Sequence, residues 1–298
     1  MKLGHGQAVV LMVLVTFLWA TAGVVTRHLQ VAQSFEVTFW RSFFTFVSML
    51  VILPAWQGWG VWRRMRQEGW MLWASGACWS VMFTAFMMAL TLTSVANALV
   101  TMAVGPLLTA LVSRAFIGNK LPLRTWAAIF VAAAGIAWMF GRQIGEGHLL
   151  GSLVALAVPV AGALNWTLVQ YSQQSGRRVD LAPAVMVGGF LSVMVTLPMA
   201  WPLQANGHDV LLLAGLGLGQ LAIPCVLSIL CARVLSATEV SLLALLEVLF
   251  GIALAWLGAN EVPQVYVLQG GALVLGALLF NEWLGRKERR RADVMPLT

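Results

Sequence analysis

Ten long apolar stretches dominate this chain of 298 residues, and they restrict its fold more than any other feature. An α-helix needs about 20 apolar residues to cross the hydrocarbon core of a bilayer. The stretches are continuously apolar, whereas barrel strands alternate polar and apolar residues, so helices are favoured. We therefore predict an all-α membrane protein with ten transmembrane helices. The predicted spans are roughly residues 8–26, 35–55, 69–90, 94–116, 124–140, 150–170, 183–203, 209–231, 237–258 and 264–284.

The 18 Lys and Arg residues are distributed unevenly between the connectors. Fifteen of them lie in alternate connectors or at the chain ends: Lys2, Arg63, Arg64, Arg66, Arg114, Lys120, Arg124, Arg177, Arg178, Arg233, Arg286, Lys287, Arg289, Arg290 and Arg291. Connectors rich in Lys and Arg stay in the cytoplasm, which leaves Arg27 and Arg142 outside and Arg41 within a span. The pattern predicts a multi-pass protein of the plasma membrane (a bacterial inner membrane), with both termini cytoplasmic.

Composition excludes several other classes of protein. With 60% hydrophobic and 10% charged residues, the chain leaves no room for a separate soluble domain. The net charge of +7 does not indicate nucleic-acid binding, because the cations flank membrane spans and no aromatic residues alternate with them on a soluble surface. Cys78, Cys225 and Cys231 fall inside apolar stretches without metal-ligand spacing. We expect no metal, no cofactor and no disulfide.

An internal repeat is the second organising feature. The motif Asn119-Lys120-Leu121-Pro122 closes the fourth span and Asn260-Glu261-Val262-Pro263 closes the ninth, 141 residues later. We predict two five-helix halves, residues 1–145 and 146–298, the second ending in a basic cytoplasmic tail. Because five is odd, the second half must cross the membrane in the opposite orientation, which makes the repeat inverted. Chance similarity between apolar helix pairs is the alternative.

Two stretches of the ninth span carry a resemblance to a known family. Residues 240–247 read VSLLALLE and residues 255–261 read AWLGANE. With ten spans in two halves, the chain resembles the drug/metabolite transporter superfamily, and within it the EamA-type transporters. In that family the ninth helix carries a central glutamate and ends in a Gly-x-Glu-like turn, and Glu247 and Glu261 match these places.

The resemblance covers nearly the whole chain and has one departure. The family's glutamate is usually followed by proline, but Val248 occupies that place here, while Gly105-Pro106 keeps a proline in the corresponding helix of the first half. Further matching positions are residues 269–273, Gly276, Trp19 and Arg27. The resemblance implies export of amino acids or related metabolites.

Two charged residues lie well inside the predicted spans and not within a few residues of their ends. Glu247 is the only acidic residue deep in a span, about 15 Å from either end. A charge at that depth must face protein or water. The functional interpretation is that Glu247 binds a substrate ammonium group or carries a coupling proton. The alternative is a structural acid that fixes helix packing through hydrogen bonds. Arg41 is shallower, and snorkelling of its long stem to the interface is the favoured interpretation; contact with a substrate carboxylate or with Glu247 is the alternative.

Six uncharged residues complete the candidate substrate-binding or coupling site. Tryptophans near the midplane are not explained by interfacial anchoring and can line a cavity, although helix packing is the simpler interpretation of each. Amides at this depth also join helices by hydrogen bonds. The six are Trp19, Trp79 and Gln220 near the midplane, and Asn97, Asn165 and Trp166 nearer to the span ends.

Three functions are compatible with these features. The first is a secondary transporter that exports small organic metabolites such as amino acids by alternating access around a midplane cavity, as a monomer or weak homodimer. The second is a flippase for lipid-linked sugars or other amphiphiles. The third, an intramembrane enzyme, is disfavoured because no nucleophile with a base and no cluster of metal ligands occurs at membrane depth. No Walker-type phosphate loop is present, so we expect no nucleotide hydrolysis.

The charge distribution generates the first testable prediction. A C-terminal fluorescent-protein fusion should be bright and a C-terminal alkaline phosphatase fusion inactive, because the basic connectors hold both termini in the cytoplasm. When the reporters are fused after Arg142, in a connector predicted to lie outside, the fluorescent protein should be dark and the phosphatase active. An active phosphatase at the C-terminus would overturn the orientation.

Overall fold

Nearly every described residue of the computed structural model is helical. The structure describes residues 3–32, 34–118, 121–143, 149–174, 180–231, 234–235 and 243–294, and it has no strand within these ranges. There, nine helical segments are long and apolar enough to cross a membrane, and a shorter apolar helix covers Leu246–Ala259. The prediction of an all-α membrane protein is confirmed.

The helices follow the predicted spans to within a few residues at most ends. The first five spans correspond to α1 (His5–Thr26), α2 (Ser34–Gln57), α4 (Trp70–Leu92), α5 (Val95–Met102) with α6 (Gly105–Ile117), and α7 (Leu123–Gln143). The last five correspond to α8 (Leu149–Gln174), α9 (Ala182–Ala200), α10 (Gly207–Gly215) with the π-helix η1 (Leu216–Ala222) and α11 (Ile223–Cys231), α13 (Leu246–Ala259), and α14 (Val265–Val294). The short helix α3 (Val61–Gln67) lies in a connector and was not predicted.

Three of the predicted spans are not continuous α-helices. The fourth is interrupted between α5 and α6, and the eighth contains the π-helix η1. In the ninth, a turn at Leu245 precedes α13, and residues 236–242 lie outside the described part. Pro106 explains the first interruption, since proline fits the first turn of a helix but not its interior. The ninth span is interrupted at the matching place, with α13 beginning 141 residues after α6, although no proline is present there.

Helix packing follows the order that two repeated halves would produce. α2 packs against α9, and α7 against α14, each helix with its counterpart in the other half. Contacts between other helices also occur in pairs that the repeat relates to each other. The contact of α4 with α8 corresponds to the contact of α1 with η1 and α11. The contact of α1 with α13 corresponds to the contact of α8 with α5 and α6. This pairing supports the division into halves, which stays a prediction because the expected boundary at residue 145 lies outside the described residues.

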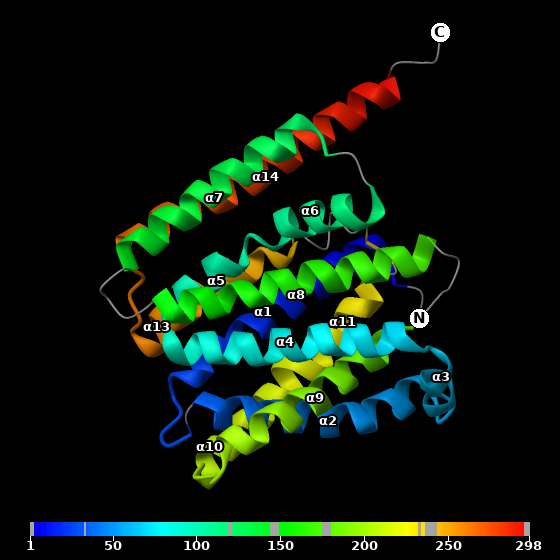
Figure 1. Ribbon diagram of the computed structural model, residues 1–298, viewed down its shortest axis with the longest axis vertical. Coiled ribbons are helices and arrows are strands. Elements are labelled where there is room, and N and C mark those ends of the chain that lie inside the picture. The colour runs from blue at the N-terminus through cyan, green and yellow to red at the C-terminus, as the bar shows by residue number, and fades with distance from the viewer. Residues whose placement is uncertain are drawn as a thin grey trace.

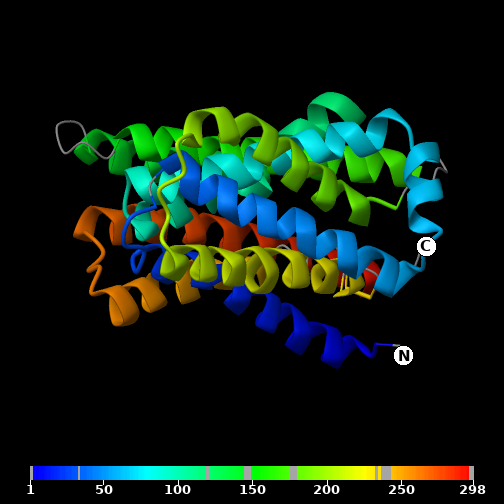
Figure 2. The same ribbon diagram turned by 90° about the horizontal axis from the view of Figure 1, so that it is seen from below.

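The beginning of α1 and the end of α14 lie at the same end of the bundle, together with α3 (Figures 1 and 2). This end carries Arg63, Arg64 and Arg66 of α3. Arg27 follows α1 and Arg142 belongs to the last turn of α7, so both lie at the opposite end, which we call the distal end. The charge asymmetry in the sequence is therefore an asymmetry between the two ends of the bundle.

The paired helices α7 and α14 run along one edge of the bundle (Figure 1). Their backbones approach closely at Gly135, where an added Cβ would lie 2.9 Å from the carbonyl oxygen of Gly270. Small residues allow such close contact between helices in a membrane, where burial of apolar surface supplies no driving force. Thr125 adds a hydrogen bond of 3.0 Å to the side chain of Asn281.

The glycine contact generates the second prediction. Gly135→Ala should lower the stability of the folded protein by about 1 to 3 kcal/mol, because the new methyl group meets backbone that cannot yield easily. Gly276→Ala is the matched control, since nothing lies within 4 Å of a Cβ at that position of α14. Thermal unfolding of both purified variants is the measurement, and equal melting temperatures would contradict the prediction.

Candidate functional site

Arg41 is the largest fully buried side chain in the described part of the chain, with 1% of its surface exposed. Its guanidinium donates to Gln220 Oε1 at 3.1 Å and to the Phe83 carbonyl oxygen at 3.0 Å. The rings of Phe83 and Phe86 lie within 6 Å of it, as in cation–π contacts. Snorkelling, the favoured interpretation from sequence, is wrong, because the side chain points into the helix bundle and not toward the interface.

Gln220 connects Arg41 to the first helix. Its side-chain nitrogen donates to the backbone oxygen of Trp19 at 3.2 Å, while its oxygen accepts from Arg41. The residue belongs to η1, where the backbone of Gly217 packs so closely on α2 that an added Cβ would lie 2.8 Å from the Arg41 oxygen. Short π-helical segments are frequent at functional sites because they displace side chains from the regular helical register.

Glu247 lies in the first turn of α13, twelve residues before the helix ends at the distal end. At 1.5 Å per residue, this places it about 18 Å deep. Cys225 of α11 is buried and lies near the side chains of Trp19, Arg41 and Glu247. We call Trp19, Arg41, Gln220, Cys225 and Glu247 the central cluster.

The two charges of the central cluster are not paired with each other. No salt bridge joins Arg41 to Glu247 among the described residues, and the guanidinium Nε has no hydrogen-bond partner there. Glu247 is only half-buried and likewise has no hydrogen-bond partner in the described ranges. The pairing of Arg41 with Glu247, one of the alternatives from sequence, is therefore not observed.

The other four predicted residues lie outside the central cluster. Trp79 lies next to Phe83, whose ring contacts Arg41, and the centroids of the Trp79 and Phe83 rings are 5.4 Å apart. Asn165 accepts a 2.6 Å hydrogen bond from Ser75, which joins α8 to α4 and fits a packing role. Asn97 is buried and donates to Thr93 Oγ1 at 3.0 Å, one turn away. Trp166 is 50% exposed on the outside of the bundle, and no cluster residue contacts it within the described structure.

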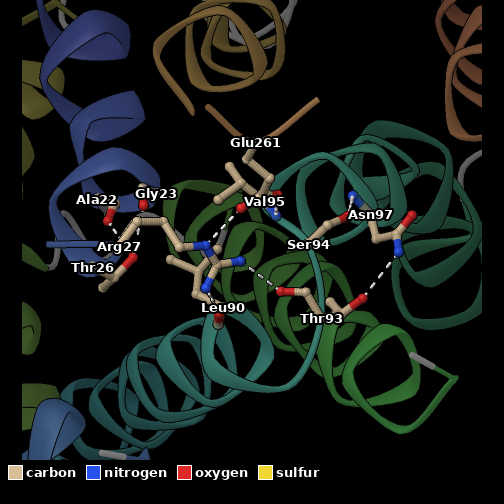
Figure 3. A network of polar contacts seen from close by, with 10 residues as sticks. All are labelled: Ala22, Gly23, Thr26, Arg27, Leu90, Thr93, Ser94, Val95, Asn97 and Glu261. Carbon is tan, nitrogen blue, oxygen red and sulfur yellow. Dashed lines mark hydrogen bonds and ion pairs between the residues drawn. The ribbon is translucent and has the colours of Figure 1, made fainter. Parts of the chain in front are cut away.

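A second polar assembly, the distal network, was not predicted from sequence as a unit (Figure 3). Arg27 forms a 2.6 Å ion pair with Glu261 and donates to the backbone oxygens of Leu90 and Thr93 at 2.6 and 2.8 Å. Glu261 also accepts from the Val95 backbone N–H at 2.6 Å. The pair thus joins the ends of α1 and α4 and the start of α5 to the connector between α13 and α14.

Two further carboxylates fasten connectors at the distal end. Asp209 of α10 is completely buried and accepts hydrogen bonds from the backbone N–H groups of residues 30, 31 and 32 at 2.8 to 2.9 Å. Glu36 of α2 accepts from Gln204 and Ala205 at 2.8 and 2.7 Å. Carboxylates that accept several backbone N–H groups are held strongly, so these hydrogen bonds fix the connectors of the distal end to the helices.

The sequence offers different signals for the functional residues that were not predicted from it. Arg27 and Glu261 are charged residues flanking membrane spans, and opposite charges at the ends of packed helices are candidates for pairing. Cys225 has no such signal, because its neighbours come from helices far apart in the sequence. Among the described residues, no group of three or more His, Cys, Asp or Glu side chains has the geometry of a metal site.

Comparison with known proteins agrees with the geometry. Residues 6–141 match the model of the EamA-like transporter family. No curated protein matches the chain significantly. A solved structure titled "Crystal structure of protein" superposes with a TM-score of 0.61 at 19% identity, covering 95% of this chain and 98% of that one. At this identity the likeness shows a shared fold.

The distal network generates the third prediction. Arg27→Gln and Glu261→Gln should each destabilise the protein, because the Arg27 and Glu261 side chains are only 28% and 19% exposed and each substitution leaves a charge unpaired. The double variant should lose less unfolding free energy than the two single variants lose together, and the difference should be about 1 to 3 kcal/mol. Thermal unfolding of all four proteins measures this coupling, and additive effects would show that the pair contributes nothing.

Proposed function

Since residues 6–141 belong to the EamA-like transporter family, we propose that the whole chain is a secondary transporter that exports small organic metabolites across the plasma membrane. The proposed mechanism is alternating access of a midplane site to the two sides of the membrane. In the orientation predicted from the charge distribution, both termini are cytoplasmic and the distal end faces outward. The proposal applies to both halves, although the family match covers only the first.

The observation that carries the proposal is the pair of opposite, unpaired charges in the central cluster. A charged residue near the middle of a bilayer costs about 2.5 to 3.5 kcal/mol on insertion scales, and other estimates are higher. Pairing would lower this cost, yet Arg41 interacts with Gln220, a backbone oxygen and two aromatic rings, and Glu247 has no ion-pair partner among the described residues. A ligand with complementary charges would satisfy both residues at once.

The chemistry of the cluster favours a zwitterionic substrate such as an amino acid. The Arg41 guanidinium offers a planar set of donors that suits a carboxylate, and its Nε has no described partner. Glu247 suits an ammonium group, and the Trp19 indole of the same cluster can supply an aromatic face. The rings of Phe83 and Phe86 cover Arg41 in this conformation, so binding requires them to move aside.

The interrupted helices support alternating access. Broken helices at the midplane are a recurrent feature of transporters built from inverted repeats, and they leave backbone groups free to face a substrate. Here α6 and α13 begin at matching places in the two halves, and Glu247 lies in the first turn of α13. The start of a helix offers unpaired N–H groups that favour negative charge, and Glu247 lies at such a start.

The fourth prediction tests the two charges separately. In cells that overproduce the protein, Glu247→Gln should abolish or strongly reduce efflux of amino acids and amines, while Arg41→Gln should affect amino acids but not simple amines. Efflux of radiolabelled substrates, normalised to the amount of folded protein in the membrane, is the measurement. Glu68→Gln, which removes a carboxylate outside the predicted spans, is the matched control.

The outcomes separate transport from structure. If Glu247 or Arg41 only fixes helix packing, the variants should lose abundance or thermal stability instead of efflux at equal abundance. Unchanged efflux in Glu247→Gln, with normal abundance, would remove the carboxylate from the mechanism. Loss of amine efflux in Arg41→Gln would contradict the assignment of the substrate carboxylate to that residue.

A further inference from the structure

A groove opens on the outer face of the α7–α14 pair, away from the central cluster. It is lined by Trp138 of α7 and by Gln269, Ala272 and Leu273 of α14, with a volume of about 580 Å³. That volume lies within the range of small-molecule binding sites. The Trp138 indole N–H donates to Gln269 Oε1 at 3.2 Å and joins the two walls of the groove.

At the distal end of the groove, Arg142 brings a positive charge that has no countercharge in the described part of the chain. The guanidinium of Arg142 lies 4.8 Å from the centre of the Trp138 ring, and no carboxylate pairs with it among the described residues. Its counterpart Arg27, the other cation expected outside, is neutralised by Glu261. No described residue accepts a hydrogen bond from the amide nitrogen of Gln269, which therefore remains available as a donor.

The depth of these groups matches the boundary between lipid headgroups and acyl chains. Arg142 belongs to the last turn of α7, Trp138 lies one turn deeper, and Gln269 lies one turn inside α14. One helical turn corresponds to about 5.4 Å. The Arg142 cation therefore lies at the headgroup level, and the Trp138 indole and the Gln269 amide lie about one turn further in. Below them the surface is apolar and open, with Leu273 44% exposed and nothing near Gly276.

We propose that the groove is a binding site for a single glycerophospholipid in the leaflet at the distal end. Arg142 contacts the lipid phosphate, the Gln269 amide donates to an ester carbonyl of the glycerol backbone, and one acyl chain lies along Ala272, Leu273 and Gly276. The charge complementarity between Arg142 and a phosphate selects a lipid over an apolar helix, which would leave the cation without a partner. This site is independent of the transported substrate.

The fifth prediction is that the protein retains one phospholipid that depends on these two side chains. Purified full-length protein is delipidated in detergent, and phosphatidylglycerol is added at increasing concentration and counted by native mass spectrometry. Arg142→Gln combined with Gln269→Leu should weaken binding of the tightest lipid by about tenfold, because a charge-assisted hydrogen bond and a neutral one are lost. Arg63→Gln, an exposed cation on α3, should leave it unchanged.

Two results would overturn the proposal. The first is the same tightest lipid affinity in the double variant and the wild type, with equal thermal stability of both. The second is efficient disulfide cross-linking of Val131→Cys, which is exposed on the outer face of α7, between two copies in native membranes. That result would show that a second copy of the chain covers this surface.

Discussion

The cost of placing charge inside a bilayer governs this structure. Each ionised side chain at membrane depth must find partners within the protein, since lipid offers none. At the distal end this requirement is met by Arg27 with Glu261, and by Asp209 and Glu36 with backbone N–H groups. In the central cluster this requirement is met incompletely, because Arg41 Nε and Glu247 have no hydrogen-bond partner among the described residues, and this difference is the basis of the proposed substrate site.

The matching interruptions in the two halves have different local causes. In the first half Pro106 lies at the start of α6, where its missing N–H is harmless. In the second half no proline is present, and the helix restarts beside Glu247, whose charge is favoured by the unpaired N–H groups of a helix start. The interruption is thus accompanied by a proline in the first predicted half and by an acidic residue in the second.

The sequence predicts the helices well but the site only in part. Apolar length and charge placement identify the spans and the clustering of cations at one end, because both depend on residue type alone. The direction of Arg41 was mispredicted, since depth along a helix does not reveal which neighbours surround it. The contacts of Arg41 with Gln220 and of Trp19 with Cys225 join residues far apart in the chain, so only the fold brings them together. Trp166, expected nearer to the end of its span, is half exposed, and its sequence position does not reveal that it faces outward.

The distal network also sets an energetic condition for transport. It joins α1, α4 and α5 of the first half to the α13–α14 connector of the second, so opening the distal end must separate Arg27 from Glu261 (Figure 3). Removing one partner from a buried ion pair costs about 3 to 5 kcal/mol, and separation of this partly exposed pair costs less because water can replace each partner. A substrate that bound both conformations equally would not shift the equilibrium. In the proposed mechanism the substrate therefore has to bind the open conformation more tightly, and Arg41 and Glu247 can provide this only if the distance between them changes as the proposed halves move.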